Sequence, residues 1–67
     1  MSPIDRVATN IRALRERRRM TQEELARAAG LSRGYLARLE TARQDPTLST
    51  LEKLAKALRV NVARLLE

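Results

Sequence analysis

Residues 21–40, TQEELARAAGLSRGYLARLE, carry the start and stop signals of two short helices with almost nothing between them. Thr21 and Glu24 have the spacing of a capping box, in which each side chain bonds the backbone of the other residue. Gly30 is the residue type that most often ends a helix, and Ser32 is a favoured helix cap. The sequence therefore predicts two short helices joined by a tight turn, which forces a large angle between their axes.

Similar signals predict one helix before this pair and two after it. Ser2 caps a helix over about Pro3–Arg18, Thr47 caps another after Pro46, and Asn61 caps a last short helix. The expected inner stripe of the fourth helix consists of Leu48, Leu51, Leu54, Ala55 and Leu58. No strand pattern, linker or repeat appears. We therefore predict an all-α single domain over residues 1–67, a compact bundle of five short helices.

The composition excludes several classes of function. The chain has 67 residues with neither cysteine nor histidine, which removes thiolate chemistry and the commonest metal ligands and general bases. We expect no enzyme activity, no metal and no cofactor. No apolar run is long enough to span a bilayer and no signal peptide is recognisable, so we expect a soluble, cytoplasmic protein that does not enter membranes.

The charge is +6 and unevenly distributed. Residues 1–43 hold ten arginines and five acidic residues, a net +5, whereas residues 44–67 have a net charge of only +1. Such an excess in so small a domain favours a polyanionic partner. A merely solvated basic surface has the same composition, so charge alone does not identify the partner.

The spacing of these signals resembles the Cro and phage-repressor type of helix-turn-helix domain, the Xre-like family. The resemblance covers nearly the whole chain, from IRALRERRR through TQEELA and S-x-x-x-L-x-x-LE to L-x-x-L-A-x-A-L-x-V. It implies a lambda-repressor-like fold in which the second and third helices form the helix-turn-helix. It also implies a dimer that binds double-stranded DNA, with the third helix, about Arg33–Thr41, in the major groove.

A helical wheel of this third helix, at roughly 100° per residue, separates two faces. Leu36, Leu39 and Glu40 lie on the inner side, with Tyr35 at the edge. The expected base-contacting residues lie on the outer side and are Arg33, Gly34, Ala37 and Arg38. A guanidinium donates two hydrogen bonds to a guanine edge, which makes the two arginines candidates for base readout.

Gly34 lies between the two arginines, in a helix where glycine costs about 1 kcal/mol relative to alanine. One interpretation is that the low strip formed by Gly34, Ala37 and Thr41 lets the backbone lie deep in the groove. The other is that a glycine near the helix start is simply tolerated. Both remain open at the level of sequence.

Further roles follow from the resemblance. Gln22 matches the family position that holds a DNA phosphate, and the other expected phosphate contacts are Ser32, Tyr35, Thr41 and Arg43. The Tyr35 phenol could equally cover core leucines. The cluster Arg17–Arg19 would be a second phosphate-facing group only if the end of the first helix points toward the duplex.

Two positions have an architectural role in the family. Arg15 and Glu40 are expected to form a partly buried ion pair between the first and third helices. Ala42 departs from the family pattern, which favours glycine or asparagine in a left-handed conformation after the third helix. Either the alanine adopts that conformation at a cost of about 1–2 kcal/mol, or the helix continues and the loop takes another path.

The last helix is the expected dimer surface, with Val60, Val62, Leu65 and Leu66 as partnering side chains. The alternative is that Val62 and Leu65 complete the core of the monomer and that Leu66 belongs to a frayed end. The function expected is a sequence-specific transcriptional regulator, a repressor, that binds a palindromic operator as a homodimer. Two alternatives stay open: an antitoxin-like module that holds a partner protein and binds DNA for autoregulation, and a nonspecific binder of nucleic acids or anionic membranes.

Overall fold

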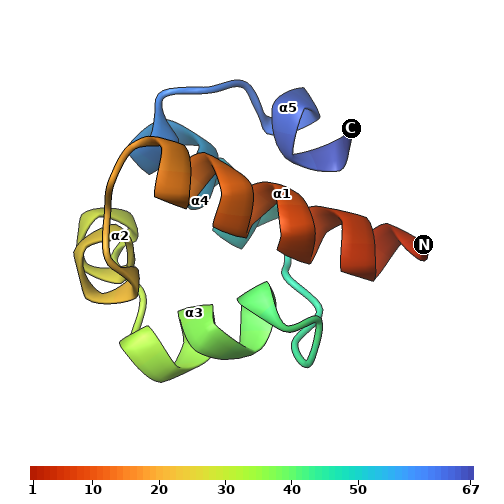
Figure 1. The fold of residues 1–67 in the computed structure, drawn as a ribbon, viewed down its shortest axis with the longest axis horizontal. Coiled ribbons are helices and arrows are strands. Elements are labelled where there is room, and N and C mark those ends of the chain that lie inside the picture. Colours follow the sequence, from red (N-terminus) through yellow and green to blue (C-terminus); the bar gives the residue numbers. More distant parts are fainter.

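The computed structural model describes residues 1–67 and contains five α-helices and no strand, as predicted (Figure 1). The helices are α1 (Pro3–Arg17), α2 (Gln22–Ala29), α3 (Arg33–Glu40), α4 (Leu48–Leu58) and α5 (Val62–Leu66). The predicted boundaries of α1 and α3 were each one residue too long, because Arg18 and Thr41 lie just outside the helices as C-terminal caps.

Serine or threonine hydroxyl groups cap the N-termini of the first four helices. In each, the cap side chain accepts a hydrogen bond from the backbone N–H three residues later, and these caps are Ser2, Thr21, Ser32 and Thr47. The prediction for α5 was wrong in this detail, because the Asn61 side chain makes no capping bond. Its backbone carbonyl instead accepts from the Arg64 N–H at 3.0 Å.

The first four helices also end alike, with a residue in the left-handed conformation. These residues are Arg19, Gly30, Ala42 and Arg59, with φ between 56° and 71°. In each case the amide of the next residue donates to the carbonyl five positions back, as Leu31 does to Ala26 at 2.8 Å. This pairing satisfies carbonyl groups that a helix end leaves free. The conformation of Ala42 decides between the two paths expected for the chain after α3: the alanine is left-handed, and the helix does not continue.

The core takes side chains from every helix. The largest fully buried residues are Ile11, Leu25, Leu36, Leu39, Leu54, Leu58 and Leu65. Helix α1 packs against α3 and α5, whereas α4 packs against α2 and α5. Leu48 was expected in the inner stripe of α4 but is 65% exposed, because it is the first residue of the helix and lies beyond the edge of the core.

Helix α1 also holds the C-terminal end of the described chain in place. The Asn10 amide donates to the carbonyl oxygens of Leu65 and Glu67, at 2.9 and 2.8 Å. These bonds fix α5 along the side of α1 that faces away from α3 (Figure 1). No helix is long and apolar enough to cross a membrane.

Candidate nucleic-acid interface

Helices α2 and α3 are joined by a turn whose backbone is held at both ends. The capping box begins α2: the Thr21 N–H donates to Glu24 Oε1 at 2.8 Å, and the Glu24 N–H donates to Thr21 Oγ1 at 3.0 Å. Gly30, at φ 71°, ends α2, and Ser32 caps α3 by accepting from the Tyr35 N–H at 3.1 Å. The turn is therefore short and bonded at both ends, which sets the angle at which α3 leaves α2.

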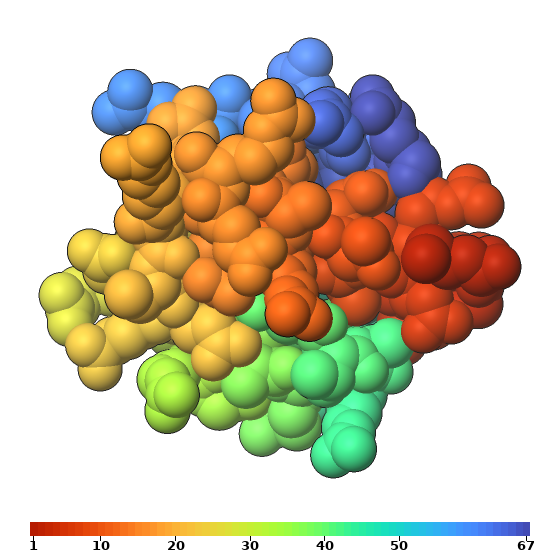
Figure 2. Space-filling model, viewed as in Figure 1, coloured from red at the N-terminus to blue at the C-terminus, as the bar shows by residue number.

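Helix α3 buries one side and leaves the other open along an edge of the molecule (Figure 2). Leu36 and Leu39 are buried against α1 and α2, as the wheel predicts. Arg33, Gly34 and Arg38 are exposed. Ala37, expected on the same outward face, is half-buried, so the bare strip is narrower than the wheel suggests.

The structure brings Arg15 and Glu40 together as a bidentate pair. Arg15 Nε donates to Glu40 Oε2 at 2.6 Å, and Nη2 donates to Oε1 at 3.1 Å. The side chains are only 12% and 2% exposed. The hydrogen bond to Glu40 raises the pKa of the Arg15 guanidinium above its ordinary value, because the carboxylate stabilises the charged form. The pair links α1 to α3 and is part of the fold.

Gln22 joins this pair in a way that the sequence did not reveal. Its Nε2 donates to Glu40 Oε1 at 3.0 Å. Arg15 Nη1 also donates to the Met20 carbonyl, at 2.8 Å, so the network includes the loop before α2. An amide nitrogen carries two hydrogens. One of them holds Gln22 against Glu40, and the second is left for a partner at the start of α2.

Arg38 does not extend straight into solvent. Its guanidinium carbon lies 5.9 Å from the centre of the Tyr35 ring, and its Nε donates a long hydrogen bond, 3.5 Å, to Gln44 Oε1. Tyr35 is half-buried and packs against the core with part of its ring. Gln44, in the loop after α3, was not predicted from the sequence, since nothing in its local pattern indicates a contact with the helix.

Ser32 and Thr41, two of the expected phosphate contacts, differ in whether their hydroxyl hydrogen is already used within the protein. The Ser32 hydroxyl uses an oxygen lone pair to cap α3, which leaves its hydrogen for another acceptor. The Thr41 hydroxyl instead donates back to the carbonyls of Ala37 and Arg38, both at 3.2 Å. The Thr41 hydroxyl would have to rotate away from these carbonyls to donate to a phosphate, and its phosphate contact stays a prediction.

The exposed arginines of α3 and of the loop after it form no ion pair. The surface ion pairs of the molecule lie elsewhere and join Arg12 to Glu16, Arg27 to Glu23 and Arg64 to Glu67. No acidic group lies within 4.0 Å of Arg33, Arg38 or Arg43, whose side chains are all exposed. The helix and the loop that follows it thus present three guanidinium groups that no carboxylate neutralises.

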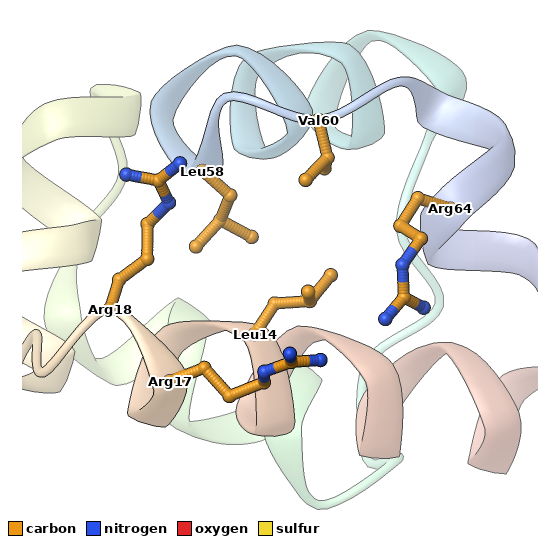
Figure 3. Close-up of a pocket in the computed structure, with 6 residues that line it drawn as sticks. All are labelled: Leu14, Arg17, Arg18, Leu58, Val60 and Arg64. Carbon is orange, nitrogen blue, oxygen red and sulfur yellow. The ribbon is translucent and has the colours of Figure 1, made fainter.

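Arg17 and Arg18, at the end of α1, line a hollow beside α4 and α5. Figure 3 shows this pocket of about 560 Å³, with Leu14, Leu58 and Val60 between the side chains of Arg17, Arg18 and Arg64. None of its lining residues comes from α2 or α3. Arg17 and Arg18 are therefore not grouped with the outward face of α3.

The expected dimer residues show three degrees of burial. Leu65 is fully buried in the core of its own chain and is not available to a partner, so this expectation is corrected. Val60 and Val62 are half-buried against the same core. Leu66, in contrast, is 51% exposed.

The arrangement of α2, the turn and an outward-facing α3 defines a helix-turn-helix protein. A family model described as "Helix-turn-helix" matches residues 11–65, and the chain belongs to that family.

Three similar proteins illustrate the family. The immunity repressor protein of Bacillus phage phi105 is 49% identical over 57 residues, which are 85% of this chain and 40% of the repressor's own length. The crystal structure of the hypothetical transcription factor NHTF from Neisseria superposes with a TM-score of 0.95 at 39% identity, covering 98% of this chain and 76% of that one. The biofilm master regulator SinR, solved in complex with DNA, has a TM-score of 0.87 at 32% identity, covering 91% and 98%.

Proposed function

We propose that this chain binds double-stranded DNA sequence-specifically and represses transcription, with α3 in the major groove. The observation that carries the proposal is the outward face of α3, where Arg33 and Arg38 are exposed and have no acidic partner. An arginine in the major groove donates two hydrogen bonds to guanine O6 and N7, at a discrimination of about 1–3 kcal/mol per pair. The hypothetical transcription factor from Neisseria and the DNA-bound regulator SinR, which share the fold, support the same conclusion.

Contacts with the phosphates of the DNA backbone would fix the register of α3 on the duplex. Gln22 is the first candidate, because its second amide hydrogen and the free N–H groups at the start of α2 suit a phosphate oxygen. Ser32, Tyr35 and Arg43 are the other candidates, and each keeps a donor that the fold does not use. These contacts raise affinity without reading sequence.

We also propose that the protein acts as a homodimer in the cytoplasm, on a palindromic operator. Two recognition helices would then read half-sites about 34–36 Å apart, or one helical turn of DNA. Leu66 is the candidate centre of the contact, since it is the exposed leucine of α5, and the half-buried Val60 and Val62 are the other candidates.

Selection on random duplex DNA tests this function directly. We expect the pool to converge on a palindrome, with affinity that falls steeply as salt rises because counterions are released from the DNA. Arg33→Ala should lose the preference at one base pair of each half-site. Lys56→Ala, which removes one positive charge from α4, is the matched control and should keep the selected sequence. A pool without any enriched sequence, at an affinity equal for all duplexes, would overturn the proposal.

A further inference from the structure

The guanidinium of Arg38 is held on three sides, although the side chain is exposed. Its Nη1 lies 3.7 Å from the point that a Cβ on Gly34 would occupy, so it rests over the bare backbone of that glycine. The Tyr35 ring lies 5.9 Å from the guanidinium carbon, and Gln44 Oε1 accepts from Nε at 3.5 Å. The strip that Gly34 leaves open on α3 is thus occupied by the head of Arg38.

Gln44 reaches Arg38 because the chain turns back at the end of α3. The left-handed Ala42, at φ 60°, reverses the backbone, and the Arg43 N–H donates to the Arg38 carbonyl at 2.9 Å. The Thr41 hydroxyl donates to the same carbonyl. These bonds place the start of the loop against the last turn of α3, where Gln44 lies half-buried.

We propose that Gln44 is a specificity-determining residue that positions Arg38 for reading a base, an inference that rests on the proposed function. Gln44 binds Nε, which leaves the two Nη groups for the bidentate contact with a guanine edge. Its amide oxygen is neutral, so it orients the guanidinium without competing for it as a carboxylate would. The head group lies beside Gly34, within ordinary van der Waals distance, 3.7 Å, of the point that a Cβ there would occupy.

The experiment uses the full chain and its selected DNA site. Binding of the wild type, Arg38→Ala, Gln44→Ala and the double variant is measured on that site and on all its single base-pair changes. We expect Arg38→Ala to lose about 10–100-fold of preference at one base pair. Gln44→Ala should lose about 3–10-fold at the same base pair, and nothing further when Arg38 is already absent. Asp45→Asn, the neighbouring control, should change affinity for all sequences alike.

A second measurement needs no DNA. In the free protein, the Arg38 Nε–H signal should be ordered on the nanosecond timescale by NMR relaxation and should become mobile in Gln44→Ala, whereas Arg33 should not change. This readout separates positioning from a general loss of fold.

The possible outcomes separate the inference from the proposed function. If a site is selected and Arg38→Ala loses a base preference that Gln44→Ala retains in full, the inference is overturned and the proposed function stands. The inference is also overturned, and the function again stands, if a site is selected and Arg38→Ala changes no preference. If no site is selected at all, the proposed function is overturned, and the inference falls with it because no base readout exists to position.

Discussion

Single residues at the helix ends show where this chain departs from local preference. Arg19, Ala42 and Arg59 adopt the left-handed conformation that Gly30 adopts without strain, and their helix ends make the same hydrogen bonds. A residue with a Cβ pays about 1–2 kcal/mol for that conformation. The bonded ends and the packing beyond them hold these residues in place.

Ala42→Gly should therefore stabilise the protein. Relief of the left-handed strain exceeds the extra backbone entropy of glycine in the unfolded chain, so we expect a gain of about 0.5–1 kcal/mol. The free energy of unfolding from urea titration measures it. Ala13→Gly, at an exposed position inside α1, should show the opposite sign with a loss of about 1 kcal/mol. A loss in both variants would refute the strain at Ala42.

Gly34→Ala tests the two interpretations of the glycine in α3. An added Cβ meets only Arg38 Nη1, at an ordinary 3.7 Å, so the fold should gain up to about 1 kcal/mol. If the protein becomes more stable and the affinity for its selected site is unchanged, deep insertion of the backbone was not the reason for the glycine. A more stable protein that binds all sequences more weakly, with the base preference of Arg38 retained, would show that the duplex approaches α3 closely at that point.

Between elements, the pairing of Arg15 with Glu40 is the contact on which α3 depends. The two side chains are almost completely buried, and Gln22 adds a third donor from the start of α2. Glu40 thus joins α1, α2 and α3 at one carboxylate. This buried ion pair fixes the helices relative to one another. If one partner is removed, the other charge stays buried without compensation, which destabilises the fold.

Glu40→Ala should cost about 3–5 kcal/mol, because the Arg15 charge would remain buried without its partner. The loss is measured as a change in the free energy of unfolding. Glu23→Ala is the matched control: its pair with Arg27 is 70–76% exposed and should contribute less than about 1 kcal/mol. Equal small effects in the two variants would contradict a structural role for the buried pair.

In the whole molecule, α5 is both the end of the core and the proposed surface for a second copy. Leu65 points inward and is fully buried, while its neighbour Leu66 is half exposed. Bonds from Asn10 hold this helix in register along α1. We therefore predict separable roles for the adjacent leucines, Leu65 in folding and Leu66 in the proposed association.

Leu66→Lys should shift the protein from dimer to monomer and leave its thermal stability at high dilution unchanged, as judged by sedimentation equilibrium and circular dichroism. Leu65→Ala should instead lose about 2–5 kcal/mol of stability by emptying a core position. A Leu66→Lys variant that remains fully dimeric would place the interface elsewhere on the molecule.

The sequence alone determined the helices and most of their ends, because caps and stripes depend on residues only three or four positions apart. It also carried the family pattern that paired Arg15 with Glu40. Only the tertiary structure decided that Leu65 is buried while Leu48 is exposed, since that depends on which helices meet.

The same holds for the polar side chains of the interface. That Gln22 bonds Glu40, that Thr41 uses its hydroxyl inside its own helix, and that Gln44 reaches Arg38 all depend on how the helices pack and how the chain turns after α3. No local pattern specifies such contacts, because their partners are chosen by the packed helices and the loop path together.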